Sequence, residues 1–312
     1  MLRITLNRAV SAAVLIIIAS IFSFVIIAAF PGNVAALIAE MRGGFVSQEV
    51  VDRVAVEYRL NDPLVLRYFH WLGDVMQGDL GSSLRTGESV STALAQRLQP
   101  TLVLVLGGSL VTLIVGTSLG LAGAMWPNGL IDRTIRAFAV FNVSMPKFFL
   151  AAMLIYVFGV QMQLLPTFGF RGPASWILPC IAVGAVPGAL LSRLMRVGLE
   201  ETMSRPFIIT AKSKGFGRRR ILFRDALPNI VPVFLTTFGM NIAFITQSSL
   251  IIEPIFSWNG VGAYFVEAAR FRDLPVLQSC LLMFSILFIL VNLAVDLIVM
   301  MADPLQRRAK RI

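Results

Sequence analysis

The sequence predicts an all-α membrane protein with six transmembrane helices and short amphipathic helices between them. Three observations lead to this fold class. Hydrophobic residues make up 57% of the 312-residue chain, and its mean hydropathy is +0.80. Charged residues make up only 14%, whereas soluble domains carry about 25%. The basic residues also gather between long apolar runs, a pattern typical of the cytoplasmic loops of membrane proteins.

Six apolar runs are long enough to cross a bilayer as helices, which takes about 20 residues. They cover residues 9–30, 101–125, 138–162, 176–194, 228–252 and 276–301. The first run exceeds the roughly 7–15 residues of a signal-peptide core, so we expect an uncleaved span. The chain then divides into three segments. Residues 1–30 form a cytoplasmic N-terminus with the first span, and residues 31–99 form an extracytoplasmic segment. Residues 100–312 form a five-span core with a cytoplasmic loop at 195–227.

The extracytoplasmic segment contains eight acids and six arginines and no run apolar enough to span. We expect two short amphipathic helices in it, lying on the membrane surface or on other helices. Ser47 is predicted to cap a helix that runs to Tyr58, because its hydroxyl can accept from the first free amides. Asp62 is predicted to cap the second helix, with Pro63 at the first helical position.

Small residues recur at steps of three and four in the second run. They form one narrow face, which predicts close packing against another helix; its members are Ser109, Thr112, Gly116, Gly120 and Gly123. The residues 126–136 that follow are expected to form a short turn. In the third run, Pro146 is predicted to kink or restart the helix. Lys147 is expected to snorkel to the cytosolic interface.

The distribution of basic residues predicts the orientation. Counted over the segments proposed to be cytoplasmic there are 18, against three in the two short outer loops. Because short basic loops stay in the cytoplasm, we expect both termini there. Nine of the 27 basic residues lie between residues 192 and 232. The whole chain has a net charge of +10. Because the basic residues lie in loops beside apolar runs, we expect them to interact with anionic lipid headgroups rather than with nucleic acid.

Within this basic loop, a short helix is predicted to start at Arg205-Pro206 and to end at Gly215 or Gly217. Its apolar face would hold Phe207, Ile208 and Ala211, with Lys212 and Lys214 beside it. A second helix would run from residue 218 to 227. Such a helix can dock in a groove on a partner or lie on anionic headgroups. The residues alone leave both interpretations open.

The stretch Thr210-Ala211-Lys212-Ser213-Lys214-Gly215, followed by Ala226-Leu227-Pro228-Asn229, resembles the EAA loop of ABC importer permeases. Aligned on Gly215, the leading Glu and Ala of the general pattern fall on Ile209 and Thr210. The form is similar to the dipeptide, oligopeptide and nickel branch. Further stretches resemble that branch: 60–64, 78–83, Ser144-Met145-Pro146 with Phe148, Glu253 to Gly262, Asp296 and Asp303-Pro304.

The resemblance implies a permease subunit that passes a small solute inward by alternating access. It also implies a second homologous permease subunit, two ATPase subunits, an extracytoplasmic solute-binding protein and a bacterial inner membrane. The short helix would be a cytoplasmic coupling helix that docks on an ATPase subunit; its residues are Phe207, Ile208, Thr210, Ala211, Lys212, Lys214 and Gly215. Di- or oligopeptides are the first expectation for the solute, and nickel or another chelated metal is the second.

The chain itself is expected to be no enzyme and to bind no cofactor. A phosphate loop needs a lysine directly after glycine, and none of the four lysines follows one. ATP and magnesium would therefore be bound by the partner subunits. One histidine and two cysteines cannot form an ordinary zinc site. A stand-alone ion-coupled carrier is an alternative of another class, but it would need ionisable residues at mid-membrane.

Six further residues are candidates for a role in transport. In the fifth run, Thr237, Asn241 and Ser248 fall within about 40° of one another on a helix, so they line either the path or a contact between helices. Glu253 and Trp258 open an outer loop and would form a gate or a binding-protein contact, with an interfacial anchor as the alternative. Asp296 lies about five residues from the end of the sixth run, and an ionisable residue in a span is a functional candidate; a structural pairing with a loop arginine is its alternative role.

Overall fold

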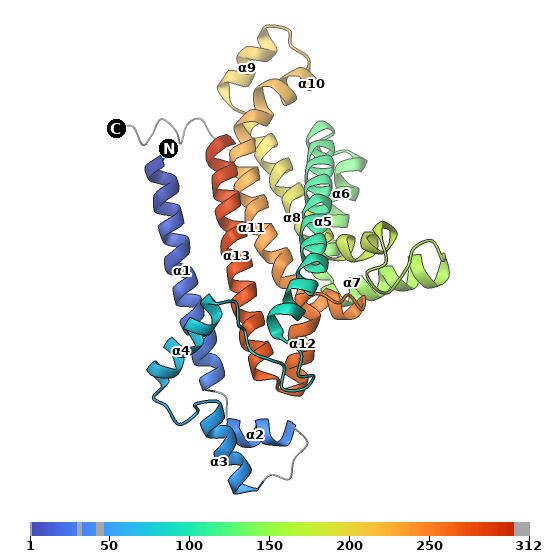
Figure 1. Ribbon diagram of the computed structural model, residues 1–312. Helices are drawn as coiled ribbons and strands as arrows, with labels where there is room; N and C mark the ends of the chain where they lie inside the picture. Colours follow the sequence, from blue (N-terminus) through green and yellow to red (C-terminus); the bar gives the residue numbers. More distant parts are fainter. Residues whose placement is uncertain (1, 30–32, 42–46, 303–312) are drawn as a thin grey trace. The chain divides into compact units, whose positions relative to one another are not determined.

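The computed structural model describes residues 2–29, 33–41 and 47–302, without the side chains of 2–7, 41, 296 and 298–302. Every named element in this part is a helix (Figure 1). The elements are α1 Leu2–Ala28, α2 Val34–Met41, α3 Gln48–Glu57, α4 Leu64–Met76, α5 Val90–Met125, α6 Leu130–Ser144, α7 Lys147–Leu154, the π-helix η1 Ile155–Gln161, α8 Pro173–Met203, α9 Pro206–Ser213, α10 Arg218–Ile221, the π-helix η2 Leu222–Ala226, α11 Leu227–Ile255, α12 Val261–Phe271 and α13 Leu274–Ala302. The predicted all-α class is confirmed.

The described helices include five that are long and apolar enough to cross a membrane, or six if one bent pair counts as a single span. The chain forms two compact units, one from residues 1–99 and 259–289 and one from residues 100–258 and 290–312. We describe each unit by itself.

Helix α8 is the centre of the second unit. Of its most apolar stretch, 72% is buried, against 22–44% for the other single-helix spans. It packs on α6, α7 and α11. A helix that is apolar on nearly all sides belongs inside a bundle, and α8 fits this description.

The small-residue face predicted on α5 is the surface that meets α8. A Cβ atom placed on Gly120 would lie 2.6 Å from Cβ of Met195, and one on Gly116 would lie 2.8 Å from Cδ2 of Leu191. Only glycine therefore permits this approach of the two helices. The Thr112 hydroxyl donates to the carbonyl of Gly184 at 3.0 Å and ties the helices together.

In the third predicted span the helix stops at Ser144 and restarts at Lys147, so of the two outcomes predicted for Pro146 the restart is confirmed. Helices α6 and α7–η1 meet at an angle of 110°. Met145 between them is extended, with φ −84° and ψ 132°, because a residue that precedes proline avoids the helical region. Residues 130–136, which the sequence predicted as part of a turn, form the first two turns of α6.

Other boundaries also differ from the prediction. Helix α5 begins at Val90 rather than at residue 101 and contains Pro100. A continuous helix of 38 residues runs from Arg218 to Ile255. Helix α4 begins at Leu64, and its cap residue is Pro63, which makes no side-chain cap bond. The predicted Asp62 cap is therefore wrong by one position.

In the first unit, α4 packs against α1 through aromatic side chains. Phe24 lies 5.5 Å from the ring of Tyr68 and 5.7 Å from that of Trp71. The hydroxyls of Ser20 and Tyr68 are 2.8 Å apart. The predicted Ser47 cap is present, since its hydroxyl accepts from the amide of Val50 at 3.4 Å. Helix α3 ends at Glu57 and Tyr58 is its C-cap, as the prediction requires.

Candidate functional site

The basic loop between α8 and α11 contains the short helix that the sequence predicts. Arg205 is extended, with φ −72° and ψ 152°, and Pro206 is the first residue of α9. After α9, Gly215 has φ +77°, in the left-handed region that glycine adopts at little cost. The predicted ends of this helix are confirmed. Figure 1 shows α9 and α10 beyond the ends of α8 and α11.

The side chains of α9 divide into an inner and an outer set. Ile208 is completely buried, and Ala211 is half-buried. Phe207 and Ile209 are 44% and 59% exposed. The sequence placed Phe207 on the same face as Ile208; the structure instead turns Phe207 outward. The polar members of the predicted set, Thr210, Lys212 and Lys214, are exposed as well.

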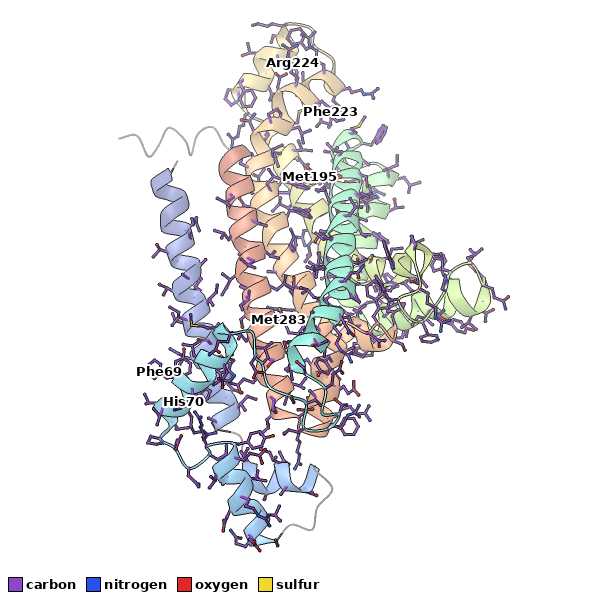
Figure 2. All side chains as sticks on the ribbon, in the orientation of Figure 1. Phe69, His70, Met195, Phe223, Arg224 and Met283 are labelled. Atoms are coloured by element: carbon purple, nitrogen blue, oxygen red, sulfur yellow. The ribbon has the colours of Figure 1, made fainter. Side chains whose placement is uncertain are left out.

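Buried apolar residues after α10 attach the loop to the bundle. Leu222 and Ala226 are fully buried and cluster with Met195 and Leu199 of α8. The Arg218 guanidinium donates to the carbonyl of Ala124 near the end of α5 at 2.9 Å. In Figure 2, Phe223 and Arg224 project from the end of the second unit that carries the loop. The loop is thus anchored on one side and exposed on the other.

A buried ion pair that the sequence analysis missed lies near this attachment. Asp132 of α6 has no exposed surface. Its carboxylate accepts from Arg196 of α8 at 2.5 and 3.0 Å and from the amide of Asn128 at 3.0 Å. It also pairs with Arg136 at 3.3 Å. Sequence spacing indicates only the pair with Arg136, which lies four residues after Asp132. Arg196 is 64 positions away, so its pairing with Asp132 could not be predicted from spacing.

The three polar residues predicted on the fifth span do not form one connected group. Thr237 donates to its own helix, to the carbonyl of Val233 at 3.0 Å. Asn241 is half-buried, and its Nδ2 atom has no hydrogen-bond partner among the described residues. Ser248 is buried and accepts from Lys147 of α7. Lys147 is therefore held inside the second unit, and the expectation that it snorkels to the cytosolic interface is wrong.

Glu253 and Trp258 are buried at the end of α11. Glu253 is completely buried and accepts from the Thr101 hydroxyl of α5 at 2.7 Å. Trp258 is 1% exposed, and its ring meets that of Phe170 edge-on at 5.1 Å. Neither side chain is presented to a partner in this structure. The side chain of Asp296, the last predicted site residue, lies outside the described part of the chain.

Comparison with known families decides what kind of protein this is. Residues 100–308 match the family described as the binding-protein-dependent transport system inner membrane component. Residues 1–105 match the N-terminal part of binding-protein-dependent transport system membrane components. The chain belongs to this family. It is a multi-pass inner-membrane subunit of an ABC transport system, as the resemblance in the loop implied.

Relatives of this family member are similar over almost its whole length. The "Probable peptide ABC transporter permease protein y4tP" of Sinorhizobium fredii is 33% identical over 96% of this chain and 97% of its own. The glutathione transport system permease protein GsiC of Escherichia coli is 32% identical over 97% of this chain and 98% of its own.

Solved structures show the same fold for the permease core. A chain of the inward-facing MetNI methionine ABC transporter has a TM-score of 0.55 and 18% identity, covering 67% of this chain and 96% of that one. A second crystal form gives a TM-score of 0.57 and 17% identity, covering 68% and 96%. These structures support the all-α membrane fold.

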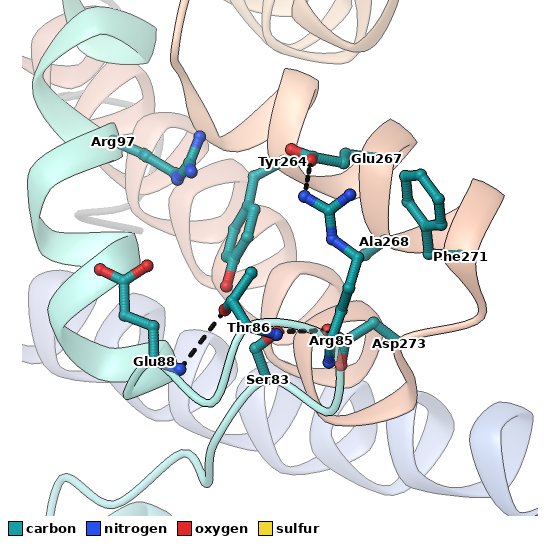
Figure 3. A pocket seen from close by; sticks show the side chains of 10 residues that line it. All are labelled: Ser83, Arg85, Thr86, Glu88, Arg97, Tyr264, Glu267, Ala268, Phe271 and Asp273. Atoms are coloured by element: carbon teal, nitrogen blue, oxygen red, sulfur yellow. Dashed lines mark hydrogen bonds and ion pairs between the residues drawn. The ribbon is translucent and has the colours of Figure 1, made fainter. Parts of the chain in front are cut away.

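In the first unit of this family member, polar residues gather around α12 (Figure 3). Buried Asp273 accepts from the Ser83 hydroxyl at 2.6 Å and from the Leu84 amide at 3.1 Å. Arg85 pairs with Glu267. The group consisting of Ser83, Arg85, Arg97, Tyr264, Glu267 and Asp273 is called the α12 cluster below.

The remaining contacts of the α12 cluster are also internal. Arg97 lies 4.2 Å from the ring centroid of Tyr264. Burial, together with the negative charge of Asp273, raises the pKa of Tyr264 to about 12. Its hydroxyl therefore remains protonated throughout the physiological range.

Proposed function

We propose that this chain is the permease subunit of an ABC importer that moves di- or oligopeptides into the cytoplasm by alternating access. The observation that supports this most is the similarity, at 33% and 32% identity, to a peptide permease and a glutathione permease. Both relatives are matched over at least 96% of this chain. Glutathione is itself a tripeptide, so both names point to short peptides.

In this proposal, α9 is the coupling helix, and its exposed side docks in a groove of an ATPase subunit. Phe207 and Ile209 supply apolar contacts, and Lys212 and Lys214 supply charge around them. Ile208 holds the helix to its own chain. Movement of the ATPase subunit would pass through Leu222 and Ala226 into α8, because these residues are packed without exposed surface.

The energy for transport would come from two ATPase subunits that bind ATP and magnesium. This chain would catalyse no reaction and hold no cofactor. The rest of the assembly would comprise a second homologous permease, an extracytoplasmic solute-binding protein and surrounding lipid. The 18 basic residues counted in the segments proposed to be cytoplasmic, against three in the two short outer loops, support an orientation with both termini in the cytoplasm.

The path for the solute would pass along α11, beside Thr237, Asn241 and Ser248. Asn241 supports this role, since its buried amide nitrogen has no partner among the described residues and a polar solute can bond to it. Glu253 and Trp258 would act as a buried gate at the end of the same helix rather than as a surface contact. Asp296 remains a proposed position for an intramembrane charge.

Uptake by the reconstituted complex tests the proposal. The chain is co-expressed with the neighbouring permease, ATPase and binding-protein genes and placed in proteoliposomes. We expect ATP-dependent uptake of a labelled tripeptide. Uptake of labelled nickel without peptide uptake would move the assignment to a metal. Gradient-driven uptake by this chain alone would contradict the ABC mechanism.

A further inference from the structure

A groove with charged and apolar parts lies between α6 and α8. Its volume is about 540 Å³, within the range of about 300–1,000 Å³ typical of ligand sites. Three arginines line it: Arg136 from α6 and Arg193 and Arg196 from α8. Among the residues that line it in the described part of the chain, none is a carboxylate.

Polarity changes along the groove in one direction. On α8, the sequence runs from Leu190 to the arginines and then toward the basic loop between α8 and α11. On α6, Arg136 comes first, and Val140 and Val143 follow. The ion pair between Asp132 and Arg196 joins the first turn of α6 to the last third of α8. The cationic ends of both walls therefore coincide, next to the loop.

The charges in this groove are not all neutralised within the chain. Asp132 pairs with both Arg196 and Arg136. Glu200, which is half-exposed, pairs with Arg196 at 3.4 Å. Arg193 is exposed and has no hydrogen bond or ion pair among the described residues. One guanidinium thus faces the groove without a counter-charge.

We propose that this groove binds an anionic phospholipid from the leaflet next to the basic loop. The phosphate pairs with Arg193, because guanidinium and phosphate form bidentate charge-assisted hydrogen bonds. An acyl chain lies along Val140, Val143 and Leu190, which are 63%, 47% and 42% exposed. Basic pockets between membrane helices on the cytoplasmic side bind such headgroups. The bound lipid holds α6 against α8, close to the loop proposed to receive force.

The test compares lipid retention by the assembled transporter in two variants. The complex is placed in bilayers of phosphatidylcholine mixed with phosphatidylglycerol, extracted gently and weighed intact by mass spectrometry. We expect Arg193→Gln to lower the retained phosphatidylglycerol about fivefold, the equivalent of about 1 kcal/mol for one basic residue. Arg133→Gln, on α6 but outside the groove, should change nothing. Arg193→Lys should retain an intermediate amount.

Three outcomes would overturn the proposal. Equal phosphatidylglycerol in Arg193→Gln and Arg133→Gln would show that Arg193 holds no lipid. Displacement of the lipid by a free tripeptide would make the groove a solute site. Loss of the partner permease in Arg193→Gln, with Arg193→Lys intact, would make it a surface between subunits. Because the readout is bound lipid, failure of the peptide assignment leaves this test unaffected.

Discussion

Charged side chains are arranged differently in the α12 cluster and in the basic loop between α8 and α11. In the cluster, Asp273 is 3% exposed and accepts from groups 188–190 positions away in the sequence. In the loop, Lys212 and Lys214 are exposed, and apolar Ile209 is 59% exposed beside them. A polar group that is satisfied internally stabilises its own fold. Exposed apolar side chains among charges instead mark a surface for another molecule.

The largest expected effect is a loss of stability when the buried carboxylate of the α12 cluster is removed. Asp273→Ala leaves the Ser83 hydroxyl and the Leu84 amide buried without an acceptor, each at a cost of about 1–3 kcal/mol. We expect the free energy of unfolding to fall by at least about 2 kcal/mol. The melting temperature of the purified complex measures this. Asp52→Ala, at an exposed site, is the control, and equal melting of both variants would contradict the assignment.

The second effect, in the basic loop, distinguishes the cost of backbone strain from the cost of added side-chain bulk. A Cβ atom on either Gly215 or Gly217 would meet nothing within 4 Å, but only Gly215 has a positive φ, +77°. Gly215→Val should strain the loop by about 1–3 kcal/mol. We expect uptake to fall tenfold or more while membrane insertion persists. Gly217→Val should transport normally; a similar loss in both variants would show that φ at Gly215 is not the cause.

The third effect concerns the exposed apolar side chains of the loop. Burying an aliphatic side chain at an interface is worth about 1.5–3 kcal/mol, so Ile209→Asp should weaken binding of the ATPase subunit tenfold or more. Co-purification of the ATPase subunit with the permease measures it. Val56→Asp, at a 69% exposed site on α3, should have no effect. Undiminished recovery with Ile209→Asp would remove Ile209 from the docking surface.

The smallest effect is expected along α11. Asn241→Leu should reduce uptake several-fold if this face lines the path, because the polar amide is lost while the branched shape of the side chain is kept. Thr236→Leu, at an exposed neighbouring position, should transport at the normal rate. Normal uptake by Asn241→Leu at normal expression would assign that face to helix packing instead.

The sequence predicted the parts of this fold that depend on local signals. Lengths of apolar runs located the spans, and Pro206 with Gly215 located both ends of α9. The glycines of α5 indicated a close contact before its partner was known. Each of these signals lies within a few residues of the structure it determines.

The remaining features depend on residues far apart in the chain. Pro146 indicated a break, but the 110° angle depends on how α6 and α7 each pack on α8. Arg196 looked like one more loop cation until the fold placed it beside Asp132. The burial of Glu253 depends on Thr101, 152 positions earlier. Sequence spacing alone carries no information about such pairs.

The central claim, that the outer side of α9 is held by an ATPase subunit, can be tested by crosslinking in cells. A photoreactive benzoyl-phenylalanine is placed at Phe207, which is 44% exposed on α9, and separately at Phe69, which is 62% exposed on α4. We predict an ultraviolet-induced adduct with the ATPase subunit from position 207 and none from position 69. An adduct with the ATPase subunit from position 69, or its absence at position 207 in an active transporter, would contradict the account.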